Sequence, residues 1–135
     1  DYVMACIIEP KLDMKNGEFI YDYPATQAAL AQVHTGADGK NYADRFELYL
    51  GGMELCNGYH ELTDFKEQAK RFQEDLNLRK QMNKDLPLED LRFLAALEHG
   101  MPECSGVALG FDRLAMLALG KQDIREVILF PGDLA

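Results

Sequence analysis

The sequence lacks the features that mark membrane, secreted and disulfide-bonded proteins. No apolar run among its 135 residues reaches the roughly 18 residues that a membrane-spanning helix requires. The opening stretch, DYVMACIIEP, lacks the basic region of a signal peptide. The three cysteines are widely spaced and form no CxxC pair, so they fit reduced thiols better than disulfides or a zinc site. We therefore expect a cytoplasmic protein without a membrane partner.

Several motifs of nucleotide binding and catalysis are also missing. The chain contains no Walker loop, GxGxxG, GxSxG or HExxH. Positive charge is scarce, and the formal net charge is −9. A protein that grips nucleic acid without sequence preference needs a basic face, so this segment is a poor candidate for holding RNA. An acidic chain that uses ATP needs a metal ion and a few well-placed arginines.

The residues that are present predict one α+β domain, or part of one. Hydrophobic residues make up 47% of the chain, which is enough for a core. An N-cap at Asp64 with Glu67 three residues later predicts the start of an amphipathic helix. The predicted elements, in order, are a strand at 19–23, one or two helical turns within 25–33, a polar loop at 35–41, a hairpin at 46–56, helices at 65–81 and 88–99, a strand at 105–110, a helix at 111–119 and a strand at 127–130. Hairpins with helices gathered between strands indicate an antiparallel sheet.

The chain is organised around the hairpin. Residues 46–50 alternate apolar and polar side chains, 51–52 are glycines that allow a tight turn, and 53–56 resume the alternation. This register places Glu47 and Glu54 on one face as diagonal neighbours, roughly 7–8 Å apart at the backbone. Two carboxylates at that spacing repel unless a cation lies between them. They are either a cation-binding pair or two solvated glutamates on an exposed face.

The residues after the hairpin, NGYHE at 57–61, extend this face. A bulge near Asn57 would re-aim the following side chains, so that Asn57 and Glu61 could join the carboxylates and bind a cationic amine. His60 is flanked by glutamate and aromatic residues. Such a histidine is more typical of a surface or packed position than of a catalytic base.

A third cluster is GVALGFDR at 106–113. Its small residues leave room for a flat ligand against the strand backbone. Arg113, on the first turn of the predicted helix, can stack on a base or pair with phosphate beside the positive end of the helix dipole. Glycines before a helix are common, so this segment alone does not identify a nucleotide site.

Taken together, these clusters resemble a known family. RFELYLGGMELCNGYHELTD and GVALGFDRLAMLALG, in this order and spacing, resemble the catalytic domain of class II lysyl-tRNA synthetases. They are still more similar to the elongation factor P–lysine ligase family, a paralogue without an anticodon-binding domain. The resemblance runs from about Phe19 to the C-terminus and includes FIYDYPATQAALAQ and EVILFP. It implies the class II fold, an antiparallel sheet flanked by helices.

The resemblance implies a site for ATP and Mg²⁺. Glu47 and Glu54 match the positions that hold the metal ion and the phosphates, and Glu54 also faces the amino acid. Leu48 matches an adenosine contact. Gly110 matches a position against the nucleotide, and Arg113 matches the motif 3 arginine on the adenine and near the γ-phosphate. Glu54 and Arg113 are thereby the expected catalytic residues.

The resemblance also implies a lysine pocket. Asn57 and Glu61 match positions that line it, with Glu61 placed to meet the ε-ammonium, and Tyr59 matches an aromatic wall. Gly106 begins the motif 3 segment and matches a substrate position. Ala108 stands where lysyl-tRNA synthetases carry glycine and the ligase family carries alanine, which suits β-lysine.

The implied activity is ATP-dependent formation of a lysyl- or β-lysyl-adenylate and transfer to a lysine of elongation factor P. The resemblance further implies a homodimer and no need for tRNA. Class II motifs 1 and 2 are not recognisable in the chain, so we expect residues 1–135 to be the C-terminal part of the catalytic domain and inactive alone. Two alternatives stay open: a lysyl-tRNA synthetase, and a non-catalytic paralogue that binds a partner or ligand.

Overall fold

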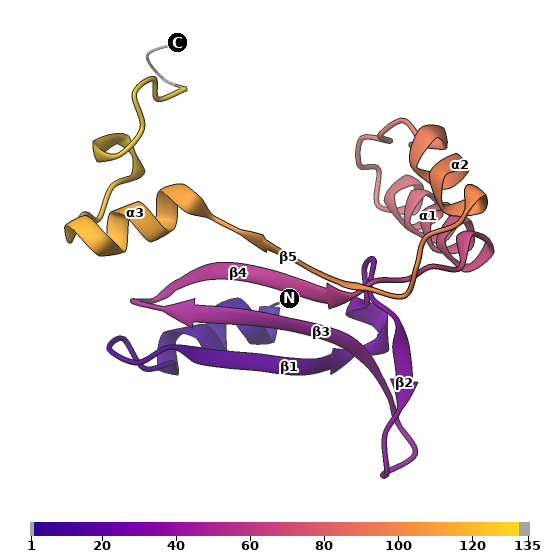
Figure 1. Ribbon diagram of the computed structural model, residues 1–135, viewed down its shortest axis with the longest axis horizontal. Coiled ribbons are helices and arrows are strands. Elements are labelled where there is room, and N and C mark those ends of the chain that lie inside the picture. The colour runs from indigo at the N-terminus through magenta and orange to yellow at the C-terminus, as the bar shows by residue number, and fades with distance from the viewer. Residues whose placement is uncertain (1, 133–135) are drawn as a thin grey trace. The chain divides into compact units, whose positions relative to one another are not determined.

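The computed structural model describes residues 2–132, which form strands, α-helices and shorter helical turns (Figure 1). The strands are β1 (Glu18–Pro24), β2 (Val33–Thr35), β3 (Asn41–Leu50), β4 (Met53–His60) and β5 (Ser105–Leu109). The helices are α1 (Phe65–Gln81), α2 (Leu91–His99) and α3 (Phe111–Leu119). The shorter turns are η1 (Met4–Ile8), η2 (Glu9–Lys11), η3 (Ala25–Gln27) and η4 (Ile124–Glu126).

The strands form one five-stranded sheet with the order β1-β3-β4-β5, and β2 also pairs with β3. Arrows of neighbouring strands point in opposite directions in Figure 1, as an antiparallel sheet requires. The predicted α+β class is confirmed. Among residues 2–132, no helix has the length and apolar character that crossing a membrane would take.

The chain forms two compact units. The first takes in the described parts of Asp1–Asp22, Arg45–Gly58 and Val107–Ala135. The second takes in Tyr23–Asp44 and Tyr59–Gly106. Strands β3, β4 and β5 each contribute residues to both.

The first unit contains the predicted hairpin turn. Gly51 and Gly52 have φ values of 62° and 73°, which is the signature of a type I′ turn and favours glycine at both positions. A Cβ atom on Gly51 would lie 2.6 Å from Cδ2 of Leu117 in α3. The turn therefore needs glycine for its backbone conformation and for the space beside α3.

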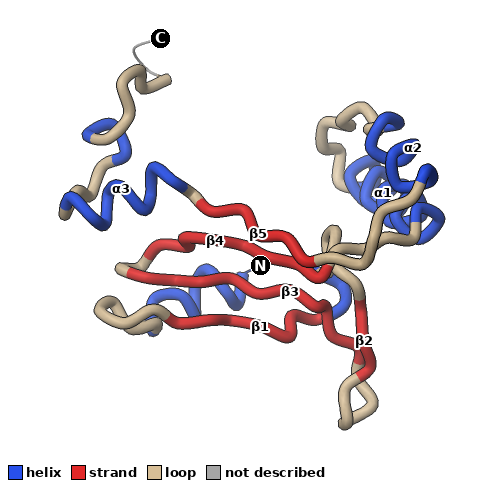
Figure 2. Tube along the Cα trace, viewed as in Figure 1, coloured by secondary structure: helices blue, strands red, loops and turns tan. Residues whose placement is uncertain are grey.

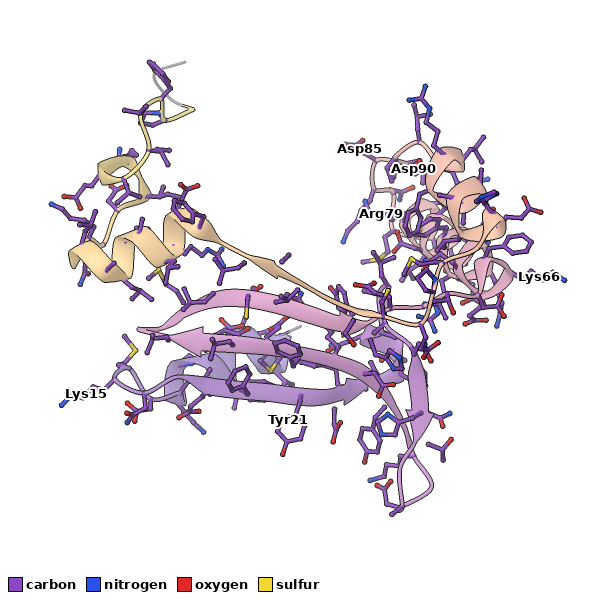
Figure 3. The ribbon with its side chains drawn as sticks, in the orientation of Figure 1. Lys15, Tyr21, Lys66, Arg79, Asp85 and Asp90 are labelled. Carbon is purple, nitrogen blue, oxygen red and sulfur yellow. The ribbon has the colours of Figure 1, made fainter. Side chains whose placement is uncertain are left out.

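The second unit contains the helical pair α1 and α2. The Asp64 side chain accepts hydrogen bonds from the N–H groups of Lys66 (2.8 Å) and Glu67 (3.2 Å), which confirms the predicted start of α1. Helix α2 begins at Leu91 rather than the predicted 88, because Asp90 (labelled in Figure 3) caps it. Phe72 of α1 and Phe93 of α2 have ring centroids 6.1 Å apart, so the two helices pack through aromatic side chains.

Strand β2 was not predicted. It pairs antiparallel with the beginning of β3, with His34 opposite Tyr42, and β3 therefore starts at Asn41, five residues before the predicted hairpin. The intervening turn is closed by a hydrogen bond from the Gly36 N–H to the Lys40 carbonyl (2.8 Å). The polar loop expected at 35–41 is thus a tight turn between two short paired segments.

The prediction of a strand at 127–130 is wrong. Asp123 accepts a hydrogen bond from the Arg125 N–H (2.9 Å) and starts the helical turn η4. The Ile124 carbonyl then accepts from Val127 (3.0 Å) and Ile128 (3.2 Å). These N–H groups are used locally and do not join a sheet, and Figure 2 shows a helical turn and loop beyond α3.

Candidate active site

Glu47 lies on β3 with its carboxylate buried in the first unit. The residue is 6% exposed, which contradicts the interpretation of Glu47 as a solvated glutamate. Its Oε1 atom forms an ion pair with Arg45, and its Oε2 atom accepts a hydrogen bond from the Tyr49 hydroxyl (2.8 Å). A buried carboxylate needs such partners, because removing its charge from water without them costs several kcal/mol or more.

Glu54 faces Glu47 from the neighbouring strand but is in a different electrostatic state. Its side chain is 38% exposed. Burial and the charge of Glu47 raise the pKa of the Glu54 carboxyl, and the charges of Arg113 and Arg45 offset this rise only in part. The ionised form of Glu54 is thus disfavoured first by burial and then by the neighbouring Glu47 charge, and a cation beside it would favour that form.

Arg113 reaches Glu54 from the first turn of α3. Its Nη1 atom donates to the Glu54 carbonyl (2.7 Å) and lies 3.9 Å from Glu54 Oε2. Gly110, the N-cap residue of α3, donates its N–H to the Leu55 carbonyl (2.8 Å) and has no side chain that could cap the helix. A Cβ atom at Gly110 would lie 3.3 Å from Arg113 Cδ, so glycine lets the arginine pass close to the backbone.

Glu54 and Arg113 line a pocket of the first unit with a volume of about 570 Å³. Its lining residues are Glu9, Tyr49, Gly52, Met53, Glu54, Arg113, Met116, Gln122, Asp123 and Ile124. A pocket of this size is within the range of small-molecule and cofactor sites. Since it combines carboxylates with a guanidinium, it is suited to a ligand that carries phosphate together with a cation.

Asn57 joins the hairpin carboxylates through Arg45. The Arg45 Nε atom donates to Asn57 Oδ1 (3.2 Å), while the same guanidinium pairs with Glu47. Sequence motifs did not single out Arg45, although its position two residues before Glu47 puts it on the same face of the strand. The predicted grouping of Asn57 with the acidic face therefore has a physical link, a bridging arginine.

Two other predicted site residues of this unit, Leu48 and Ala108, have apolar side chains. Leu48 alternates with Glu47 and Tyr49 along β3, and its Cδ1 atom would lie 3.2 Å from a Cβ on Gly17. Its side chain therefore points away from the carboxylate face, and only its backbone is available on the Glu47 side. Ala108 is exposed on β5, where its methyl group is open to a ligand.

The second unit holds Tyr59, Glu61 and Gly106. Tyr59 is half-buried. A Cβ atom on Gly106 would lie 2.5 Å from Glu61 Oε1, so the carboxylate occupies the space that a side chain at 106 would fill. Glu61 and Gly106, predicted from separate clusters, are thus neighbours. Among residues 2–132, no group of three or more His, Cys, Asp or Glu side chains is arranged to hold a metal ion by itself.

Several relatives of the chain carry the same name. A protein of Haemophilus ducreyi named Elongation factor P--(R)-beta-lysine ligase is 48% identical over 129 residues, which cover 96% of this chain and 39% of that protein. Proteins of the same name from Proteus mirabilis (52% identical, 92% of this chain, 38% of that protein) and Klebsiella pneumoniae (51%, 95% and 39%) are similar to it as well. The chain spans about two fifths of the length of these curated relatives.

A family model described as tRNA synthetases class II (D, K and N) matches residues 6–134, nearly the whole chain. The antiparallel sheet with its hairpin and flanking helices agrees with the class II fold that the sequence predicted. The chain therefore belongs to the D, K and N group of the class II tRNA synthetase family.

Proposed function

We propose that the protein carrying this chain is an ATP-dependent ligase that activates β-lysine or lysine and transfers it to a lysine of elongation factor P. The observation that carries the proposal is the pocket in which Glu54, a carboxyl with raised pKa, lies beside Arg113. The name of the relatives, elongation factor P--(R)-beta-lysine ligase, is the basis for proposing β-lysine as the amino acid and elongation factor P as the acceptor. Membership of the class II family is the basis for proposing adenylation as the class of chemistry.

We propose that the pocket holds ATP with Mg²⁺. Proteins hold Mg²⁺ through one or two carboxylates plus substrate phosphates, so a cluster of three protein ligands is not required. Glu54 suits this role because burial and the Glu47 charge disfavour its ionised form, which a cation would favour. We assign Glu47, whose charge acts on Glu54, to the same ion. When bound, the ion would neutralise triphosphate charge.

The reaction we propose has two steps. A carboxylate oxygen of the amino acid attacks the α-phosphorus of ATP, and the bond to pyrophosphate breaks. The amine of the acceptor lysine then attacks the carbonyl carbon of the adenylate, and AMP leaves. Arg113 offsets phosphate charge, while Gly110 lets the nucleotide approach the backbone, so the protein acts by positioning and electrostatics.

Other residues are assigned to the amino acid. In the first unit, we assign Asn57 and Ala108 to the substrate, with the Ala108 methyl group shaping the pocket for β-lysine. In the second unit, we assign Glu61 to the ε-ammonium, Tyr59 to an aromatic wall and Gly106 to the space that the Glu61 carboxylate requires. A carboxylate is the natural partner of a primary ammonium group.

We propose a protein acceptor rather than tRNA, and a homodimer for the complete protein. The net charge of −9 supports this choice, because a tRNA-binding surface would need basic residues that this chain does not supply in excess. Lysyl-tRNA synthesis and binding without chemistry are the alternatives. No observation on this chain favours either of them.

The test is ATP–pyrophosphate exchange by the complete protein with (R)-β-lysine or α-lysine, followed by transfer of the labelled amino acid. We expect exchange with both amino acids to depend on Mg²⁺, and label on elongation factor P but not on tRNA. A variant of elongation factor P that lacks the acceptor lysine is the control. Label on tRNA would favour the synthetase, and binding of an adenylate analogue without exchange would favour the non-catalytic paralogue.

A further inference from the structure

The backbone of Glu61 is held from both sides within the second unit. Its N–H donates to the Cys104 carbonyl (3.0 Å), and its own carbonyl accepts from Gln32 Nε2 (3.1 Å). Glu61 also forms an antiparallel bridge with Ala31. Because neighbouring segments on both sides hold these atoms, the point from which the Glu61 side chain leaves the backbone is fixed.

The Glu61 carboxylate lies in the space beside Gly106. The close approach of its Oε1 atom to Gly106 is possible only while residue 106 has no side chain, since a Cβ would lie 2.5 Å away. The clash would be with the far end of a flexible side chain. An alanine at 106 would therefore displace the carboxylate rather than the strand.

The Gln32 amide links Glu61 to an acid–imidazole pair. Its Nε2 atom has two hydrogens, and the two nearest acceptors are Glu103 Oε1 (2.9 Å) and the Glu61 carbonyl (3.1 Å), with His60 Nε2 farther away at 3.4 Å. Glu103 Oε1 also lies 2.6 Å from His60 Nε2, and His60 Nδ1 lies 3.4 Å from Asp44 Oδ2. The Glu103 carboxylate thus orients the Gln32 amide, and the His60 imidazole holds the Glu103 carboxylate in place.

We infer that Gln32, His60 and Glu103 are positioning residues that fix Glu61 for recognition of the substrate ammonium group. The inference rests on the proposed function, and it assigns His60 a role that its sequence surroundings did not indicate. The attraction between a carboxylate and an ammonium falls with distance and depends on hydrogen-bond geometry. Misplacement of such a group by about 1 Å can cost up to 100-fold in rate. A network that fixes Glu61 therefore contributes to substrate binding without touching the substrate.

The test is Gln32→Met in the complete protein, assayed by ATP–pyrophosphate exchange with (R)-β-lysine. Methionine keeps the length of the side chain and removes both donated hydrogen bonds. We expect the KM for β-lysine to rise about 10-fold, while kcat and the KM for ATP stay within about twofold. Gln73→Met is the matched control, because Gln73 Nε2 donates to Glu89 Oε1 (3.1 Å) in the same unit but contacts neither Glu61 nor its partners.

The acid in the network gives a second comparison. Glu103→Ala removes the acceptor that orients Gln32, so we expect it to raise the KM for β-lysine as Gln32→Met does. Glu103→Gln keeps an acceptor oxygen at the same place and should restore a KM close to that of the unsubstituted protein. A role in stability alone would lower the thermal midpoint without this split between the two KM values.

Each result decides the inference. Equal KM values for Gln32→Met and Gln73→Met, or a KM for ATP that rises in step with that for β-lysine, would overturn the positioning role and leave the proposed function intact. No exchange by the unsubstituted protein with either lysine would overturn both. The two failures are therefore distinguishable.

Discussion

Glu47 and Glu54 lie on the same hairpin, but their surroundings differ. Glu47 is buried and has Arg45 and Tyr49 on its two oxygens, whereas Glu54 is partly exposed and keeps a raised pKa. The first carboxylate is already compensated by the protein. The second is the one whose charge a bound cation would relieve, so we expect Glu54 to be the more sensitive of the two to metal and nucleotide.

Glu54→Gln should reduce metal-dependent ATP turnover in the complete protein. The amide keeps the shape of the side chain but removes the charge that the cation requires, and we expect a loss of at least about 100-fold in kcat/KM. Glu67→Gln, on the surface of α1 where Glu67 pairs with Arg71, is the control and should stay within about twofold. Equal losses in the two variants would return Glu54 to the role of an ordinary solvated glutamate.

Glu54→Gln should lower activity but raise the stability of the protein without ligand. Because the folded pKa of Glu54 is raised above its ordinary value of 4.5, its protonated form favours folding below about that pH. This contribution is lost as the pH rises through the folded pKa. Glu54→Gln imitates the protonated form, so it should raise the thermal midpoint at pH 7 and have little effect at pH 3.5. The gain should be less than about 1 kcal/mol, since water screens a partly exposed charge.

A substitution at Ala108 tests whether this residue belongs to the pocket for the amino-acid substrate. Its methyl group stands exposed on β5. By the proposed assignment, its removal would enlarge the space beside the substrate amine. We expect Ala108→Gly in the complete protein to shift the ratio of kcat/KM toward α-lysine, by about 10-fold, the scale of one methyl group in a pocket. An unchanged ratio in pyrophosphate exchange would remove Ala108 from the specificity site.

At the scale of elements, local sequence signals located most of the fold. The alternation around Gly51 and Gly52 predicted the hairpin turn, and Asp64 predicted the start of α1, because these signals act within a few residues. Strand β5 and helix α3 were predicted from small residues followed by a helical period. The amino-acid sequence alone therefore predicts the elements that position the hairpin carboxylates and Arg113.

The elements that sequence reasoning missed depend on partners distant in the chain or on a competing cap. Strand β2 exists because it pairs with β3, which no pattern in its three residues indicates. Residues 127–130 are apolar, as in a buried strand. However, Asp123 caps a helical turn just before them, and that turn takes the place of an extended strand. Within the site, alternation placed Glu47 and Tyr49 on one face. The pairing of Arg45 and the network around Gln32 require three-dimensional proximity.

Gly51 allows a test of the hairpin turn. Gly51→Ala combines a left-handed φ of 62° with a methyl group 2.6 Å from Leu117, whereas Gly39→Ala has a φ of 78° and open space. Both should lose about 1 kcal/mol from backbone strain. We expect Gly51→Ala to lose about 1–3 kcal/mol more through overpacking, measured by denaturant unfolding. Equal losses would mean that Leu117 moves aside without cost.

At the scale of the whole molecule, one edge of the sheet is exposed. Strand β5 is last in the order of the sheet, and its side chains Val107 and Leu109 are 61% and 50% exposed. An edge strand with exposed apolar side chains is typical of a surface that further protein covers. The curated relatives are longer proteins, of which the chain spans about two fifths.

The 135-residue chain alone should therefore form no adenylate. By its resemblance to the family, the α-phosphate of ATP is held by an arginine of motif 2, and that motif is not recognisable here. By the proposed assignment, Arg113 and a metal ion on the hairpin carboxylates would offset phosphate charge at one side of the reaction, but an unrestrained α-phosphate loses the orientation that in-line attack needs. We expect ATP–pyrophosphate exchange by the chain to stay at background with α-lysine and with (R)-β-lysine, under conditions where the complete protein is active. Exchange above background would mean that Arg113 and the hairpin suffice for adenylation, and that the arginine of motif 2 is dispensable.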